Sequence, residues 1–269
     1  GYKVYYQPKS VIIHYEGKTA GIDLSGGFKK YQVSNREKFI QKWKEDLKKQ
    51  FNFDVKNVLN ASERGVKKRI LVLDHFLPMF DKASGSLRLF NILKSMKAIN
   101  CHVSFIAMNN EGEAKYRPIL EEIGVETYTI FNFSSGNALN VEALSAFLKE
   151  RDFDYAVIEF WNLAKNWIPF LRKTSPDTKI IVDSVDIHFI REVREAELKE
   201  DKELLKKALR NKEQEIFTYR QADRVWVVTE DDRRAIEGYL GKIPIDIVPN
   251  IHERVIVEKK FESTRDILF

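Results

Sequence analysis

Residues 69–90 read RILVLDHFLPMFDKASGSLRLF, and this stretch decides the fold of most of the chain. An apolar run, Ile70–Leu73, predicts a strand, and the pattern from Ser86 onward predicts a helix. The turn into that helix carries Ser84 and Gly85. A strand, a loop and a helix in this order form the first part of a βαβ unit. The stretch therefore predicts an α/β domain built on a parallel sheet.

The same alternation of strands and helices continues along the rest of the chain. Strands are predicted at Ile70–Leu73, His102–Ala107, Glu126–Ile130, Tyr155–Ile158, Lys179–Val182, Arg224–Val228 and Asp246–Val248. Helices are predicted at Ser86–Lys97, Glu113–Ile123, Val141–Glu150, Trp161–Lys173, Ile190–Tyr219 and Glu230–Tyr239. Short apolar strands between helices imply a Rossmann-like parallel sheet with helices on both faces. Such open sheets bind ligands at the carboxyl ends of their strands.

Composition narrows the class of protein. Of 269 residues, 43% are hydrophobic and 12% aromatic, which predicts a folded globular chain. The net charge of +5 suits anionic substrates or an anionic membrane surface. Because the charges are interspersed and no aromatic-basic motif is present, we expect no nucleic-acid partner. The single cysteine, Cys101, excludes an intrachain disulfide and favours a cytoplasmic location. No run approaches the roughly 20 apolar residues that cross a bilayer.

The first 68 residues have a different pattern. Residues 1–30 alternate as β-strands do, with an apolar run at Val11–His14. A helix is predicted at Asn35–Gln50, with Asn35 as its N-cap. Its residues Phe39, Trp43 and Leu47 share one face and predict a packing surface. Residues 51–67 lack a clear period and are interpreted as a linker.

Polar residues follow the predicted strand Lys179–Val182, on the same sheet edge as the loop before Ser86. Asp183, Asp186 and His188 come first, and Arg191 and Arg194 follow near the start of a helix. Cations in the first turn of a helix oppose its dipole, so they indicate a nearby anion or partner carboxylate. The set is open to three interpretations, namely a ligand site, a salt-bridge network that holds the loop, and a metal site.

Gly85 lies where the backbone of a helix N-terminus could approach a phosphate or a sugar hydroxyl. The alternative is an ordinary turn in which Ser84 is the N-cap. No Gly-rich dinucleotide fingerprint and no Walker motif is present, which disfavours NAD binding. Two further features are ambiguous in isolation. Pro249 and Asn250 end a strand, as a connector would, and His14 leaves a strand into a Gly-containing loop, where it is a metal or phosphate contact or a structural residue.

In this order, the motifs resemble two glycosyltransferase modules. Residues 1–17, with Asn35, Phe39 and Trp43, look like the tail of a family 2 glycosyltransferase of the GT-A fold. The resemblance implies that His14 approaches the metal–diphosphate of a sugar nucleotide. It also implies a divalent metal, Mg or Mn, for the intact module, whose other motifs would precede Gly1. We therefore expect residues 1–50 to be a small β/α remnant of that domain.

Residues 68–262 resemble the N-terminal Rossmann-like half of a family 4 glycosyltransferase of the GT-B fold. The resemblance rests on Arg69–His75, Ser84–Ser86, Ile181–Arg194, Ala222–Thr229 and Val248–Asn250. It implies a nucleoside-diphosphate sugar, a glycan or lipid-linked acceptor, and no metal for this part. A C-terminal half, beginning at residues 263–269, would face it across a cleft, so the sequence is expected to be a piece that is inactive alone.

The resemblance also assigns roles to residues. The backbone N–H groups of Gly85 and Ser86 would hold the diphosphate, and His188 would contact a sugar or acceptor hydroxyl. Asp186 would share the catalytic role of His188. The remaining donor- or substrate-binding residues would be Ser84, Asp183, Arg191, Arg194 and Asn250.

The function expected from this resemblance is sugar transfer in the assembly of bacterial surface polysaccharide. The setting would be the cytoplasm, with peripheral contact at the inner face of the cytoplasmic membrane. Two other functions are weighed beside it. One is a non-catalytic acceptor-binding or scaffold module, and the other is a Rossmann-type epimerase or dehydrogenase, which the missing Gly-rich fingerprint disfavours.

Overall fold

The computed structural model describes residues 10–13, 15, 28–52, 54–63, 65–136 and 138–252. The chain divides into two compact units, Gly1–Arg64 and Gly65–Phe269. The sequence placed a linker at residues 51–67; the unit boundary falls within that range, but residues 55–62 of it form helical turns. His14 and residues 1–9, whose sequence alternates as a strand does, lie outside the described residues. What was expected of them stays a prediction.

The first unit contains short helices. They are η1 Phe28–Lys30, α1 Tyr31–Lys42, α2 Lys44–Leu47, η2 Val55–Asn57 and α3 Val58–Ser62. Asn35 is not an N-cap, because α1 begins four residues earlier, after Lys30. The predicted helix is also interrupted at Trp43, whose backbone leaves the helical region. Residues 10–13 form no strand, in contrast to the prediction.

The apolar face predicted on α1 and α2 is present but exposed. Phe39 and Trp43 lie with ring centroids 6.5 Å apart and are 55% and 43% exposed. None of the residues of α1 and α2 is buried. The expectation that this face packs within the described residues is therefore wrong. The GT-A origin of this unit stays a prediction.

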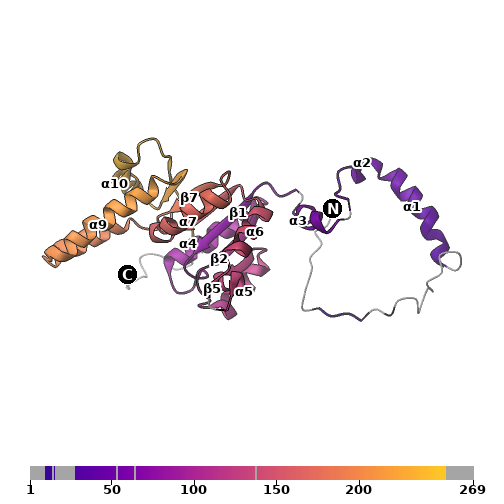
Figure 1. The fold of residues 1–269 in the computed structure, drawn as a ribbon, viewed down its shortest axis with the longest axis horizontal. Helices are drawn as coiled ribbons and strands as arrows, with labels where there is room; N and C mark the ends of the chain where they lie inside the picture. Colours follow the sequence, from indigo (N-terminus) through magenta and orange to yellow (C-terminus); the bar gives the residue numbers. More distant parts are fainter. Residues whose placement is uncertain are drawn as a thin grey trace, which may run out of the picture. The chain divides into compact units, whose positions relative to one another are not determined.

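A seven-stranded parallel sheet forms the centre of the second unit (Figure 1). Its strands are β1 Arg69–Asp74, β2 His102–Ala107, β3 Glu126–Thr129, β6 Tyr155–Glu159, β7 Lys179–Asp183, β8 Arg224–Val227 and β9 Ile245–Ile247. Every strand predicted after residue 68 is present, with its ends within one residue of the prediction. A short antiparallel pair, β4 Ser134–Ser135 and β5 Ala138–Leu139, follows η3 Ile130–Phe133 and was not predicted.

The helices of this unit confirm the α/β alternation with one correction. They are α4 Ser84–Ala98, α5 Glu113–Glu122, α6 Val141–Arg151, α7 Trp161–Thr174, α8 His188–Leu198, α9 Lys202–Tyr219 and α10 Glu230–Leu240. The single helix predicted at Ile190–Tyr219 is wrong. The chain turns at Glu200, where φ is 51°, and the Asp201 carboxylate caps α9 by accepting from the N–H groups of Glu203 and Leu204. One end of α9 extends beyond the sheet (Figure 1).

Helices cover both faces of the sheet, so the predicted Rossmann-like class is confirmed. Side chains of α4 and α5, such as Leu93 and Leu120, pack on Val72 and Phe105 from one face. Side chains from α6, α7, α9 and α10 pack on the alternate strand residues, such as Ile158, from the other. Full burial of one such side chain contributes about 1.5–3 kcal/mol. The two cores therefore fix the sheet and the positions of its strand ends.

The strand order β3-β2-β1-β6-β7-β8-β9 places a topological switch between β1 and β6. From β1 the chain proceeds outward to β2 and β3, then crosses back to β6 and proceeds outward on the other side. Ligands of open α/β sheets bind at the carboxyl ends of the strands that flank such a switch. The fold thus points to the residues that follow β1 and β6. Within the described part of the chain, no helix is long and apolar enough to span a membrane.

Candidate functional site

Three acidic residues end the three adjacent strands at the switch. They are Asp74 of β1, Glu159 of β6 and Asp183 of β7, here called the acid row, and they are only 3%, 2% and 0% exposed. The register aligns them, because Leu73 pairs with Ile158 and Glu159 pairs with Asp183. Each lies two residues after a core residue on the face of the sheet that α4 covers, namely Val72, Val157 and Ile181. Side chains two residues apart in a strand point to the same face. The acid row therefore lies under α4, in the interior of the unit.

Burial disfavours charge on these carboxyl groups. Burial raises the pKa of Asp74 to about 7. The backbone N–H of His75 donates to this carboxylate at 2.6 Å, which lowers the pKa and offsets part of the effect of burial. Burial also raises the pKa of Glu159 well above its usual range, and the nearby charges of Asp183 and Asp74 raise it further. Burial thus favours the neutral form of Glu159, whose carboxyl group shares a hydrogen bond with Asp183.

Arg88 of α4 supplies the positive charge that faces the acid row. Its Nη1 donates to Asp183 Oδ2 at 2.7 Å, and its Nε donates to the carbonyl of Val248 at 2.9 Å. Both members of the ion pair are buried. Burial raises the pKa of Asp183, and Arg88 opposes this shift. Asp183, expected to bind substrate, is instead committed to an internal ion pair, because it has no exposed surface.

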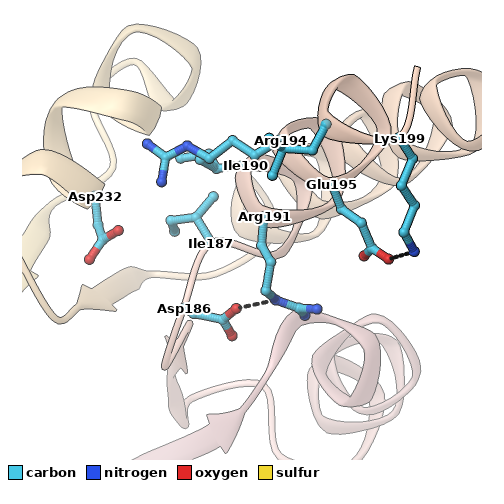
Figure 2. Close-up of a pocket in the computed structure, with 9 residues that line it drawn as sticks. Asp186, Ile187, Ile190, Arg191, Arg194, Glu195, Lys199 and Asp232 are labelled. Carbon is cyan, nitrogen blue, oxygen red and sulfur yellow. Dashed lines mark hydrogen bonds and ion pairs between the residues drawn. The ribbon is translucent and has the colours of Figure 1, made fainter. Parts of the chain in front are cut away.

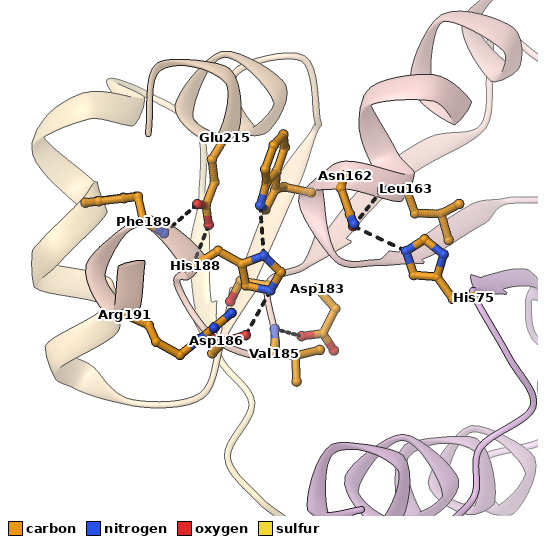
Figure 3. Close-up of polar contacts among 12 residues, drawn as sticks. His75, Asn162, Leu163, Asp183, Val185, Asp186, His188, Phe189, Arg191 and Glu215 are labelled. Atoms are coloured by element: carbon orange, nitrogen blue, oxygen red, sulfur yellow. Dashed lines mark hydrogen bonds and ion pairs between the residues drawn. The ribbon is translucent and has the colours of Figure 1, made fainter. Parts of the chain in front are cut away.

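His188 is held at the start of α8 through both ring nitrogens, as Figure 3 shows. Trp161 Nε1 donates to His188 Nδ1 at 3.0 Å, and His188 Nε2 lies 3.0 Å from Asp186 Oδ1. Burial lowers the pKa of His188, but Asp186 raises it by more. Burial raises the pKa of Asp186, and its bonds to His188 and Arg191 bring it below the usual range. The structure thus brings together Asp186, His188 and Arg191, as the sequence predicted.

The anion that compensates the start of α8 is part of the protein. Ile187, the N-cap, offers no side-chain acceptor. Instead, Glu215 of α9 accepts from the N–H groups of His188 at 3.1 Å and Phe189 at 2.9 Å, and Tyr219 Oη donates to it at 2.7 Å. Sequence reasoning missed Glu215. The signal was the missing acidic residue in the first turn of α8, but sequence gave no way to locate the partner on another helix.

A second imidazole, that of His75, lies after β1, the strand on the other side of the switch from β6. His75 Nε2 lies 3.3 Å from Asn162 Oδ1 in α7 (Figure 3). The ring of Phe160 lies near both histidines, with centroids 6.1 Å from His75 and 5.7 Å from His188. Phe160 has φ 63°, an unfavourable conformation for a residue with a side chain. We call His75, Asn162 and His188 the rim. Sequence reasoning missed His75 and Asn162 as site residues, although the first residue after β1 is a regular place for ligand contacts.

The first turn of α4 packs close to the loop before α8. Ser84 is the first residue of α4 and Ala83 is its N-cap, so the interpretation of Ser84 as the N-cap is wrong. A Cβ on Gly85 would lie 3.2 Å from Val185 Cγ1. Gly85 is therefore needed for close packing of α4 against the loop after β7. Ser84 is exposed and Ser86 is buried. Contact of the Gly85 and Ser86 N–H groups with a diphosphate stays a prediction.

Arg191 and Arg194 line an open hollow of about 530 Å³ between α8 and α10 (Figure 2). The hollow also has Ile187 and Ile190 on its wall. Its charged lining residues are Asp186, Arg191, Arg194, Glu195, Lys199 and Asp232. Positive and negative groups are equal in number there, so charge alone does not select an anion. Among the described contacts Arg194 forms no ion pair, and its ligand-binding role stays a prediction.

Asn250 lies on the segment that leaves β9. Arg88 holds the Val248 carbonyl, and Asn91 Nδ2 donates to the Ile251 carbonyl at 2.7 Å. This segment is thus fixed to α4 on both sides of Asn250. The Asn250 side chain itself is exposed, and its contact with a donor stays a prediction.

The metal expected for the first module has no donor set on which it can be tested, since His14 lies outside the described residues. In the described ranges, no group of three His, Cys, Asp or Glu residues is arranged to hold a metal ion. No protein-family model matches the chain, and no curated protein matches its sequence. The fold and the strand ends define a Rossmann-like α/β unit with a polar edge at its topological switch.

Proposed function

We propose that the second unit is part of a glycosyltransferase that moves a sugar from a nucleoside-diphosphate sugar to a glycan or lipid-linked acceptor. The observation that supports this best is the rim, two imidazoles and an amide that converge around Phe160 at the switch of the sheet. Small-molecule sites combine aromatic surface with a few polar groups in this way, and open α/β sheets place them at this edge. The ordered resemblance to family 4 glycosyltransferases agrees with that placement.

Sugar transfer makes two demands that these residues suit. The diphosphate leaves with negative charge, and free N–H groups at the start of α4 would stabilise that charge. The sugar and the acceptor carry hydroxyl groups, which imidazole and amide side chains can bind. Asp186 and Arg191 contribute by holding His188 in place. The buried Asp183 contributes through Arg88 rather than by direct contact.

A second candidate is a binding module without catalytic activity. The observation that favours it is that both nitrogens of His188 are in internal hydrogen bonds. In that arrangement His188 shapes the site and transfers no proton to or from a ligand. Such a module would bind glycan and leave transfer to another protein or domain.

The test is a binding titration of the full chain with UDP-glucose, GDP-mannose, the disaccharide cellobiose and NAD. We expect binding of a sugar nucleotide or of the disaccharide, and no binding of NAD. His188→Ala removes the ring that packs on Phe160 and should weaken sugar binding by about 3- to 10-fold through loss of this support. Lys206→Ala, which changes an exposed ion pair with Glu203 on α9, is the matched control and should leave affinity unchanged.

Two outcomes would contradict the proposal. Binding of NAD with no binding of the sugars would favour a dehydrogenase or epimerase. Sugar affinity that is the same in wild type and His188→Ala would remove the ligand from the rim. A transfer assay with labelled sugar nucleotides then separates the enzyme from the binding module, because only the enzyme produces labelled glycan.

A further inference from the structure

We propose that His75, rather than His188, is the imidazole that contacts the ligand, and that its Nδ1 accepts a hydrogen bond from a sugar hydroxyl. This assignment rests on the proposed function and names the contact residue of that site. Three observations carry it, namely the orientation of Asn162, the proton on His75 and the engagement of His188.

The orientation of the Asn162 amide is fixed by its own helix. The backbone N–H of Leu163 donates to Asn162 Oδ1 at 2.9 Å. An N–H group can donate only to the oxygen of an amide and not to its NH₂ group. The atom of Asn162 that faces Leu163 is therefore the oxygen. The same oxygen lies 3.3 Å from His75 Nε2.

The position of that oxygen determines the tautomer of His75. Asn162 Oδ1 can only accept, so His75 Nε2, at 3.3 Å, must be the donor and carries the ring proton. In the neutral ring Nδ1 then has a free lone pair. Nδ1 has no hydrogen-bond partner among the described residues, and the side chain is half-buried, which leaves the ring accessible. His75 is thus prepared to accept a hydrogen bond from a ligand hydroxyl.

His188 lacks this freedom. Its Nδ1 accepts from Trp161 and its Nε2 donates to Asp186, so a ligand could reach either nitrogen only by replacing one of these bonds. Its backbone is also fixed by Glu215. These contacts make His188 a positioning residue, whose ring packs near Phe160 with centroids 5.7 Å apart.

The place of His75 in the fold agrees with this role. It is the first residue after β1, directly at the switch, and its backbone N–H is anchored on Asp74. Phe160 lies beside its ring and offers apolar surface of the kind that lines ligand sites. A sugar that stacks on Phe160 would bring a hydroxyl within reach of Nδ1.

The first arm of the test needs no ligand. Nitrogen-15 NMR of the full chain, labelled at histidine, reports which ring nitrogen carries the proton. We expect His75 to be protonated at Nε2 in wild type and in Asn162→Asp, which keeps the acceptor, and to become a mixture of tautomers in Asn162→Ala. His102, at the amino end of β2, is the internal control and should be unchanged. Protonation of His75 at Nδ1 in wild type would overturn the proposal without use of any variant.

The second arm adds UDP-glucose, GDP-mannose or cellobiose, which separates a sugar on a nucleotide from a glycan. We expect the Nδ1 signal of His75 to shift on binding while the ring signals of His188 stay in place. His75→Ala should weaken binding by about 3- to 10-fold. If the His188 signals move and those of His75 do not, the assignment of His75 as the contact residue is refuted, and the proposed function stands. If no sugar binds at all, the proposed function fails and the hydroxyl contact fails with it.

Discussion

The acid row and the rim lie at the same end of the sheet, yet the acid row is buried and the rim is partly exposed. The acid row is buried, where Arg88 pairs with Asp183 and burial raises the pKa of Asp74 and of Glu159. The rim is only partly buried, and its polar groups are held by hydrogen bonds, one of them to the Asp186 carboxylate, that leave His75 Nδ1 without a partner among the described residues. The difference teaches that strong pKa perturbation marks buried supporting groups in this fold and not the accessible polar edge. Perturbed carboxyl groups support the strand ends, and the rim side chains are partly exposed.

The largest effect is expected from Arg88→Met, which breaks the buried ion pair of the acid row. Removal of one partner leaves Asp183 buried without its counter-charge, which costs about 3–5 kcal/mol. Urea unfolding of the full chain measures this loss. The control is Lys206→Met, which breaks an exposed pair and should cost less than about 1 kcal/mol. Equal effects of the two variants would show that the Arg88–Asp183 pair is not buried in solution.

The second effect is a pH dependence that Asp74 creates. Its pKa is about 7 in the folded chain and 3.8 as the unperturbed value, so between these values the folded state binds more protons than the unfolded state. The free energy of unfolding therefore falls as pH rises, by about 2 kcal/mol between pH 5 and pH 7. Asp74→Asn should reduce that slope, and the raised pKa of Glu159 accounts for the part that remains. Unfolding curves at several pH values compare the two proteins, and an unchanged slope in the variant would contradict the assignment.

A smaller effect is expected from Glu215→Gln, which tests the support of the rim. The amide keeps one acceptor oxygen but loses the charge at the start of α8 and one of the two carboxylate bonds, at a cost of about 1–2 kcal/mol. Hydrogen exchange of the His188 and Phe189 amides should become faster. Glu213→Gln, at an exposed position on the same helix, is the matched control. Unchanged exchange in Glu215→Gln would mean that water replaces this cap.

The smallest effect concerns the contact that joins α4 to the loop before α8. Gly85→Ala places a methyl group 3.2 Å from Val185 Cγ1 and should lower the free energy of unfolding by about 0.5 kcal/mol. In a Val185→Ala background the same substitution should cost nothing. A double-mutant cycle by urea unfolding measures this coupling, and additive effects would show that the two residues do not touch.

The fold could be predicted from sequence because its signals are local. Apolar runs such as Ile70–Leu73 mark strands buried on both faces, and no distant contact is needed to identify them. The errors were also local in origin. Asp201 ends one helix and caps the next, but it reads as an ordinary charged residue in a long charged helix. Ala83 precedes α4 without a capping side chain, and the neighbouring Ser84 was a better match to the rule.

The site was predicted only in part, because half of its contacts join distant residues. Asp186, His188 and Arg191 are close in sequence, so their association was foreseeable. Arg88 contacts Asp183 across 95 positions, and His75 contacts Asn162 across 87. In sequence Arg88 resembles a surface residue of an amphipathic helix, and only the packed sheet shows that it is buried. Charge on the interior face of α4 becomes understandable once the acid row is known.

The two bonds of Arg88 link proton binding to the position of the segment after β9. Arg88 holds the Val248 carbonyl and at the same time lowers the pKa of Asp183. Displacement of Val248 together with Arg88 would raise that pKa, so the displaced state binds protons more tightly than the packed state. By reciprocity, acid favours displacement of residues 248–251, and neutral pH favours their attachment to α4. The buried Asp183 thus makes the attachment of residues 248–251 to α4 depend on pH.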